Sequence, residues 1–291
     1  MRDNGILFAI LQPQKGETPI RAIELNKSDF DSLYSMFSQE LWKLKTNVIS
    51  FSGEYKPEFD ESLEIKGFKL PEYVKEATDN PLGVDSLTIE DGEIEKLKAV
   101  FLVKQSEDEY RIFCQKFKKN QYLSQNFLKV FWDKNTVHSV NKPGINITNA
   151  VDCYYEDGSL FFKSYYIANQ IFDLNEYYRE ATREDLEKFA NLDVIAIEND
   201  VEELEEMNKW TRKKIATILD SGVLEKNNIK NILKFANELN IEIEVKNKKI
   251  LFPADKQKQR NILKFLCDEI FRGNLSDNIY ETNSKKLTQS S

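Results

Sequence analysis

The fold of this chain is decided by AVFLVKQSEDEYRIFCQKF, residues 99–117. An apolar run at residues 99–103 and a run of mixed, mainly apolar and aromatic residues at 110–117 flank the polar segment QSEDE at residues 105–109. Short runs of β-branched and aromatic residues joined by a polar segment are typical of a β-hairpin. We therefore predict a strand-rich core built around this pair.

Strand signals continue on the C-terminal side of the hairpin. Residues 128–132 form one candidate strand, and residues 145–155 and 159–164 form two more. Glu156-Asp157-Gly158 lies between the last two, and an Asp-Gly pair favours the tight turn of a hairpin. The sequence from 99 to 172 is therefore predicted to be mainly strand.

The N-terminal side adds strands and one helix. Residues 6–11 and 20–25 are short apolar runs that suit strands. Ser28 with Asp31 resembles an N-cap and its acid at the third position, and apolar residues then recur at helical spacing to about residue 45. Prolines and glycines interrupt every longer pattern between 46 and 98, which predicts an irregular insertion there.

After Phe172 the apolar period changes from two residues to 3.6, which predicts helices. The predicted elements are short helices from Asp173 and Thr182, an apolar segment at 194–197, helices at 200–220 and 225–239, a hairpin at 241–252, and a last helix opened by Pro253 and Asp255 that ends at Gly273. The fold class is therefore α+β. Residues 1–150 form a strand-rich domain with one helix and the insertion at 46–98, and residues 151–291 form a mixed domain of helices with a small hairpin.

Composition excludes several classes of protein. With 41% hydrophobic residues the chain can bury a core, and no segment approaches the 18 consecutive apolar residues of a membrane helix. The N-terminal apolar run is too short for a signal peptide. Three widely spaced cysteines are expected to be reduced thiols, which favours a cytoplasmic location. With one histidine, His138, and no Cys-x-x-Cys, we predict no metal site and no cofactor.

The basic residues are concentrated near the C-terminus, although the formal net charge is −8. Residues 207–291 contain 17 Lys and Arg against 10 Asp and Glu, whereas residues 151–206 contain 16 acids and 4 bases. A polyanion responds to a local basic surface rather than to the global charge. The charge distribution therefore indicates where a nucleic acid would bind.

Three predicted helices carry bases four residues apart, on one helical face. The sets are Lys209 and Lys213 with Arg212 beside them; Lys226, Lys230 and Lys234; and Lys256, Arg260 and Lys264. The helix at 200–220 begins with acids and ends with bases, as its dipole favours, so its bases need no partner. The other two sets begin at a helix N-terminus, where a cation is unfavourable, and they are the stronger evidence for an anionic partner. A solvated helix face is the alternative for each set.

Two further basic features are less specific. A helix pair followed by a hairpin is also the order of a winged-helix domain, with Lys246, Lys248 and Lys249 in the wing, but many α+β domains share that order. The segment from Asn278 to Lys286 could follow a phosphate backbone as a flexible arm, or be a frayed terminus.

No catalytic motif accounts for the chain. Glycine-rich phosphate loops and the His-Glu-x-x-His zinc motif do not occur. Glu244-x-Lys246 on a predicted strand resembles the carboxylate–lysine pair of Mg²⁺ nucleases, although alternating Glu-Ile-Glu-Val-Lys is also typical of any half-exposed strand. We therefore predict no catalytic residue and keep a Mg²⁺ nuclease as an alternative.

Five segments occur in one order over the C-terminal half. They are the strand and turn around Val151-Asp152 and Asp157-Gly158-Ser-Leu-Phe-Phe162, Tyr177-Tyr-Arg-Glu-Ala181 after Phe172, Arg212-Lys-Lys-Ile215, Ile262-Leu-Lys-Phe-Leu266, and Tyr280-Glu-Thr-Asn-Ser-Lys285. In this order, over about half the chain, they resemble the KwaB family, the soluble component of the Kiwa anti-phage defence system. Residues 1–150 match less well.

The resemblance implies a cytoplasmic DNA-binding protein that acts with the membrane protein KwaA, is recruited by it to the inner face of the membrane, and restrains phage DNA. It brings no catalytic residues. The DNA-contacting candidates that it implies are Arg212, Lys213, Lys214, Lys285 and Lys286. The charge argument adds Lys230, Lys234, Arg260 and Lys264.

Binding is expected to be largely independent of DNA sequence, because no base-reading motif is present, and the chain is expected to form a homodimer or higher homo-oligomer. A second alternative is a scaffold without nucleic-acid contact. In it the acidic block at 151–206 would pair with the basic block of another subunit.

Overall fold

The computed structural model contains the predicted hairpin. Strands β5 (Leu97–Ser106) and β6 (Glu109–Lys116) pair antiparallel, from Ala99 opposite Lys116 to Ser106 opposite Glu109. The structure describes residues 5–12, 18–88, 92–106, 109–123, 129–133, 136–140, 142–198, 204 and 206–286. The chain divides into unit 1, residues 1–51 and 57–174, and unit 2, residues 52–56 and 175–291.

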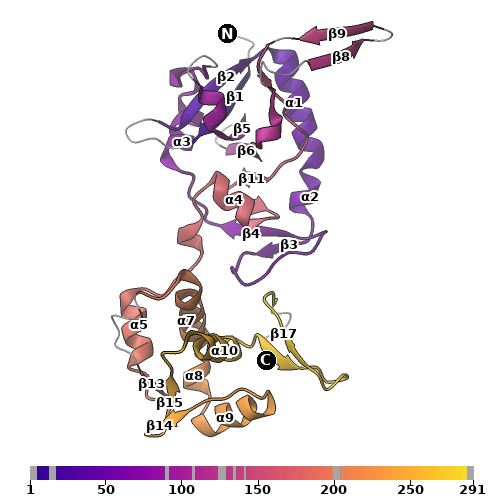
Figure 1. Ribbon diagram of the computed structural model, residues 1–291. Helices are drawn as coiled ribbons and strands as arrows, with labels where there is room; N and C mark the ends of the chain where they lie inside the picture. Colours follow the sequence, from indigo (N-terminus) through magenta and orange to yellow (C-terminus); the bar gives the residue numbers. More distant parts are fainter. Residues whose placement is uncertain are drawn as a thin grey trace. The chain divides into compact units, whose positions relative to one another are not determined.

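Unit 1 is built on an eight-stranded sheet with the order β2-β1-β5-β6-β11-β12-β4-β3 (Figure 1). The remaining strands are β1 (Gly5–Leu11), β2 (Ile20–Leu25), β3 (Val48–Ser50), β4 (Ser62–Lys66), β11 (Cys153–Glu156) and β12 (Ser159–Phe162). All neighbours are antiparallel except β3 and β4, which are parallel. The α+β fold class is confirmed, and the hairpin at 99–117 supplies the middle of the sheet.

The turn between β11 and β12 is the predicted Asp-Gly turn. Asp157 and Gly158 have φ angles of 50° and 72°, the left-handed pair that a two-residue hairpin requires. Strand β11 pairs with β6, and β12 pairs with β4. These two strands therefore belong to unit 1, and the units divide after Leu174. The boundary predicted from the sequence lies at 150/151.

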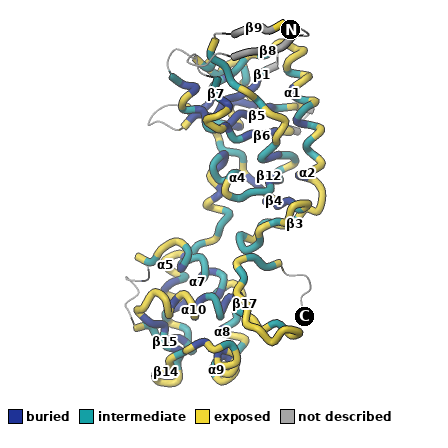
Figure 2. Tube along the Cα trace, turned by 45° about the vertical axis from the view of Figure 1, so that its right-hand side comes forward, coloured by how far each residue is buried: buried dark blue, intermediate teal, exposed yellow. Residues whose placement is uncertain are grey.

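One face of the sheet is covered by helices α1 (Lys27–Glu40) and α2 (Trp42–Lys45). Leu33 and Phe37 of α1 pack on buried strand residues such as Val100 and Phe113. The helix is capped by Asn26, whose side chain accepts a hydrogen bond from the Asp29 N–H (2.9 Å), rather than by Ser28 as predicted. The buried residues follow the central strands in Figure 2.

Successive side chains of a strand point to opposite faces of the sheet, so the strands also supply residues to the other face. Phe8 and Phe101 stack there with ring centres 4.8 Å apart. Helix α4 (Tyr165–Ile171) packs against β5 and β6, and α3 (Glu72–Asp79) packs near β2. Both helices bring buried apolar residues to the unit, so the sheet is covered on two sides.

Residues 46–98 are more regular than predicted. They contribute β3, β4 and α3, together with two 3₁₀ turns, η1 (Pro81–Gly83) and η2 (Glu93–Lys96). The glycines and prolines end these elements without excluding the segment from the sheet. The smaller elements of unit 1 are η3 (Lys119–Gln121), β7 (Tyr122–Leu123), β8 (Lys129–Asp133), β9 (Thr136–Val140) and β10 (Gly144–Ile145). His138 lies on β9, but its side chain is outside the described part.

Unit 2 surrounds a separate core. Its elements are η4 (Asn175–Tyr177), α5 (Arg183–Ala190), β13 (Ile195–Ile197), α7 (Lys209–Ser221), α8 (Val223–Lys226), α9 (Ile229–Glu238), β14 (Val245–Lys246), β15 (Lys249–Phe252), α10 (Lys256–Leu266), β16 (Ile270–Arg272) and β17 (Ile279–Glu281). The predicted cap of α5 is confirmed, because Thr182 and Asp185 form a reciprocal capping box. Phe189 and Phe252 meet edge to face in the core, with centres 5.5 Å apart.

Three helix boundaries in unit 2 differ from the prediction. Helix α7 starts at Lys209 after the N-cap Asn208, and the stretch at 225–239 is divided into α8 and α9. Helix α10 ends at Leu266, where Cys267 is the C-cap, and the next residues form β16 instead of continuing to Gly273. Side-chain caps from Asn208 and Asn228 mark the two starts that the apolar period did not reveal.

The cysteines are buried thiols. Cys114, Cys153 and Cys267 are free, and burial raises the pKa of each. Among the described residues, no helix is long and apolar enough to cross a bilayer.

Candidate nucleic-acid interface

The bases of α7 lie at the beginning of the helix. Lys209 directly follows the N-cap, and the first turn contains no acid. The charge gradient predicted for this helix is therefore wrong for α7, and its acids at 200–203 lie outside the described residues. A cation at a helix N-terminus is unfavourable, so these bases need another source of stabilisation.

Glu180 provides that stabilisation. Its carboxylate contacts Lys209 Nζ (3.0 Å) and Arg212 Nη2 (2.8 Å). Burial alone would raise the pKa of Glu180, but the hydrogen bonds from Arg212 and Lys209 outweigh it and hold the pKa below its usual value. Arg212 also accepts a backbone hydrogen bond from the Ala181 N–H (3.2 Å). Arg212 thus joins α7 to the segment before α5.

Lys213 and Lys214 point into contacts within unit 2. Lys214 Nζ forms an ion pair with Glu269, whose side chain is 8% exposed. Lys213 Nζ lies over the ring of Tyr178. Burial, with repulsion from Lys209, lowers the pKa of Lys213 to about 8. Neither ammonium is presented to solvent as a surface lysine would be.

Helix α9 presents its bases differently. Lys230 and Lys234 are both exposed, one helical turn apart. Lys234 approaches Glu238 at 3.9 Å, a pair whose side chains are 70% and 54% exposed and therefore contributes little. Lys226 is the last residue of α8, where a cation is favoured, and its Nζ donates to the Ser221 carbonyl (2.9 Å). Lys226, the first residue of this predicted set, therefore lies on a different helix from Lys230 and Lys234.

Helix α10 begins with an exposed cation, as predicted. Lys256 is its first residue, after the N-cap Asp255. Arg260 is exposed, and its guanidinium lies 5.2 Å from the ring centre of Trp210. Lys264 is engaged by Glu281 (2.5 Å) and is 12% exposed. Lys256 and Arg260 are therefore exposed. Lys264 instead links α10 to β17 through its ion pair with Glu281.

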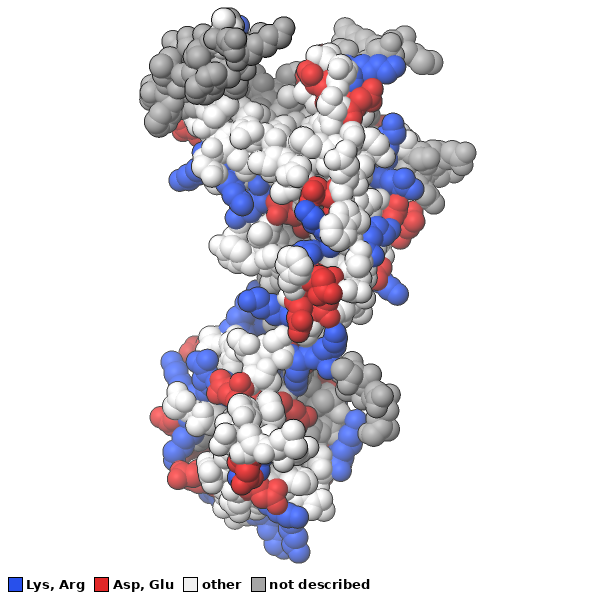
Figure 3. All heavy atoms as spheres, turned by 90° about the vertical axis from the view of Figure 1, so that its right-hand side faces the viewer, with Lys and Arg blue, Asp and Glu red and all other residues white. Residues whose placement is uncertain are grey.

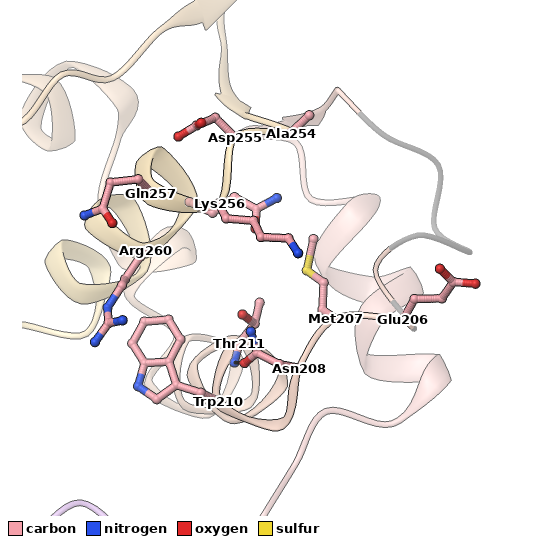
Figure 4. A pocket seen from close by; sticks show the side chains of 11 residues that line it. Glu206, Met207, Asn208, Trp210, Thr211, Ala254, Asp255, Lys256, Gln257 and Arg260 are labelled. Carbon is pink, nitrogen blue, oxygen red and sulfur yellow. Dashed lines mark hydrogen bonds between the residues drawn. The ribbon is translucent and has the colours of Figure 1, made fainter.

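A pocket of about 960 Å³ separates the start of α7 from the start of α10. In Figure 4 the Lys256 side chain points into it opposite Met207, and Trp210 lies beside Arg260. The side chains of Asn208 and Asp255 already accept hydrogen bonds from their own helices. Trp210 was not a predicted site residue, although an aromatic residue inside the basic segment KWTRKK at 209–214 was a visible signal.

The C-terminal segment is paired within unit 2. Strand β17 pairs with β16, and Tyr280 stacks on Phe271. Lys285 Nζ contacts the Glu54 carboxylate (3.6 Å) and donates to the Cys267 carbonyl. Lys286 Nζ lies 5.1 Å from the ring centre of Tyr55. Residues 284–286 therefore contact residues 54–56 and residues 279–281 pair with β16, so the segment does not form a free arm.

The predicted candidates divide into two groups. Contacts inside unit 2 engage Arg212, Lys213, Lys214, Lys264, Lys285 and Lys286. Lys230, Lys234 and Arg260 remain exposed, together with Lys256. Figure 3 shows Lys and Arg interspersed with Asp and Glu on the visible face of unit 2. On that face the basic residues form small groups rather than one continuous field.

The motif considered for a nuclease has a local partner. Glu244 accepts from Lys258 Nζ (2.9 Å), and both side chains are more than half exposed. In the part of the chain that is described, no group of three or more His, Cys, Asp and Glu could hold a metal ion. The absence of a catalytic residue stays a prediction.

A family model of proteins described as "Kiwa protein KwaB-like" matches residues 95–276, more than half of the chain. The match begins just before β5 and extends past β16. No curated protein and no solved structure matches the chain.

Proposed function

The chain belongs to the family of Kiwa KwaB-like proteins, which indicates a role in Kiwa anti-phage defence, and we propose that it acts there by binding DNA through phosphate contacts of unit 2. The observation that supports this most directly is the exposed set Lys230, Lys234, Lys256 and Arg260. These bases lie in the first two turns of α9 and α10. Anions are favoured at that end of a helix, so a phosphate there would relieve an unfavourable cation position.

The number of exposed bases sets the expected salt dependence. Each phosphate neutralised on duplex DNA contributes about −0.9 to the slope of log K against log salt concentration. About four contacts therefore give a slope of about −3.6. Contacts to phosphate carry no base information, so the affinity is expected to vary little with DNA sequence.

Fluorescence anisotropy of a labelled duplex, measured with the full chain over a series of salt concentrations, tests the proposal. Lys230→Glu/Lys234→Glu is expected to weaken binding strongly. The matched control is Lys66→Glu/Lys75→Glu, which makes the same change in net charge at exposed positions of unit 1. Equal loss in both variants, or binding that does not respond to salt, would contradict a site on unit 2.

The partner and assembly state belong to the same proposal. We expect the chain to bind the membrane protein KwaA and thereby to be recruited to the membrane, and to form a homo-oligomer. Co-expression with KwaA should move the chain into the membrane fraction, and light scattering should give the assembly size. A chain that dissociates in salt without ever binding DNA would instead support a scaffold.

We propose no catalytic step. Long incubation of DNA with the chain and Mg²⁺ is expected to leave the DNA intact. Cleavage that Glu244→Ala abolishes would support the nuclease alternative.

A further inference from the structure

Unit 1 contains a pocket that the proposed DNA site does not use. Its volume is about 690 Å³, within the range of roughly 300–1,000 Å³ that small-molecule sites occupy. It lies where η2, β5, β6, η3 and α4 meet. The lining residues are Gln12, Ile94, Glu95, Leu97, Lys98, Lys116, Phe117, Lys119, Tyr122, Asn169 and Gln170.

Regular structure brings three lysines to this pocket from separate elements. Lys98 is near the start of β5 and Lys116 is at the end of β6, where Ala99 pairs with Lys116. The Phe117 N–H donates to the Lys98 carbonyl (2.9 Å), which carries the chain directly into η3 and Lys119. The central hairpin of the sheet therefore fixes Lys98 and Lys116, and Lys119 follows it on η3.

The lining of the pocket carries more positive than negative charge. Glu95 is the single acid in the lining. Within the described part of the chain, none of Lys98, Lys116 and Lys119 takes part in an ion pair, and Lys116 Nζ instead donates to the amide oxygen of Gln170. Burial lowers the pKa of Lys98, although the charge of Asp173 opposes this. Partial burial of a cation is unfavourable, and a bound anion would reduce that penalty.

The rest of the lining suits a flat ring. Tyr122 and Phe117 supply aromatic surface, and Ile94 and Leu97 supply aliphatic surface. The side-chain amides of Gln12 and Asn169 lie in the same lining and offer both donors and acceptors. Polar groups at fixed positions around apolar surface are what orients a small ligand.

We propose that this pocket binds a nucleoside phosphate, with the phosphate on Lys98, Lys116 and Lys119 and the base against the aromatic side. The site lies in unit 1 and is independent of the DNA contacts proposed for unit 2. The lysines act as point charges for the phosphate, while the aromatic side chains select ligands that also carry a ring.

Isothermal titration calorimetry of the full chain at low salt, with AMP, ATP, adenosine and inorganic phosphate, tests this assignment. AMP or ATP is expected to bind saturably with one site per chain, and adenosine and phosphate are each expected to bind more weakly. No saturable binding of either nucleotide would overturn the proposal. Phosphate that binds as tightly as AMP would overturn the role of the ring.

Variants locate the site. Lys98→Gln and Lys119→Gln are each expected to reduce nucleotide affinity by about tenfold, the effect of one lost charge-assisted contact. Lys119 is exposed, so its substitution tests the site even if Lys98→Gln disturbs folding. Lys66→Gln/Lys75→Gln and Lys230→Gln/Lys234→Gln are the controls, and both are expected to keep the affinity. A loss seen with Lys230→Gln/Lys234→Gln but not with Lys119→Gln would show that the nucleotide binds unit 2 instead.

Discussion

The bases of α7 and those of α9 have the same helical spacing but different surroundings. Lys209 and Arg212 share the carboxylate of Glu180, and Lys214 is paired with a buried Glu269. Lys230 and Lys234 are exposed, and Lys234 forms a long, exposed ion pair with Glu238 at 3.9 Å. A set of bases at helical spacing is therefore evidence for a polyanion site only when the fold leaves those bases exposed.

The largest expected effect is a difference between α7 and α9 in how much their lysines contribute to the free energy of unfolding. Lys214→Ala would leave the carboxylate of Glu269 buried without its cation, which should lower the free energy of unfolding by about 3 kcal/mol. Urea denaturation followed by circular dichroism measures this. Lys230→Ala is the matched exposed control and should change stability by less than about 0.5 kcal/mol. Equal effects would mean that the two helices do not differ in this way.

The second prediction compares α7 and α9 by the salt dependence of DNA binding. Lys230→Gln/Lys234→Gln should reduce the magnitude of the salt slope by about 1.8, because two phosphate contacts are lost. Lys209→Gln/Arg212→Gln removes the same charge from α7 and should leave the slope nearly unchanged, since both bases are already engaged by Glu180. A larger slope change in the α7 variant would reverse the assignment.

The C-terminal lysines give a smaller effect. Lys285→Ala removes the contacts to Glu54 and the Cys267 carbonyl and should cost about 1 kcal/mol of stability, without changing the salt slope. Thermal unfolding and anisotropy on the same sample report both quantities. A reduced slope with unchanged stability would restore Lys285 as a DNA contact.

The last prediction concerns the pH dependence of stability due to Lys213. Its pKa is about 8 in the folded chain against 10.5 as the ordinary value, so between these pH values the unfolded chain holds more protons. Its contribution to stability therefore rises with pH from about 8 to 10.5. Lys213→Met should remove this rise in urea midpoints measured across that window. An unchanged pH profile would place Lys213 in solvent, like the lysines of α9.

Local signals predicted some elements well. The hairpin at 99–117, the Asp157-Gly158 turn and the capping box at Thr182 each depend on residues close together in the sequence, and all three are present. Pairings between distant segments were not predicted. Strand β4 enters the sheet beside β12, and residues 52–56 join unit 2, through contacts that no local pattern encodes.

The candidate site shows the same limit. The sequence correctly predicted that Lys256 lies at a helix start, because Pro253 and Asp255 are residues typical of helix N-termini. It could not show that Glu180 and Glu281 would neutralise Arg212 and Lys264, since those acids lie far from their partners in the chain. Which bases stay exposed is decided by packing.

The sequence by itself determined the α+β class, the central hairpin, the family and the concentration of bases in the C-terminal part. These follow from residue type, period and order, which are properties of the chain alone. The tertiary structure decided which of those bases are engaged by acids and which remain available, and it assembled the lysine pocket of unit 1. Electrostatic interaction depends on distance in space, and only the folded chain fixes that distance.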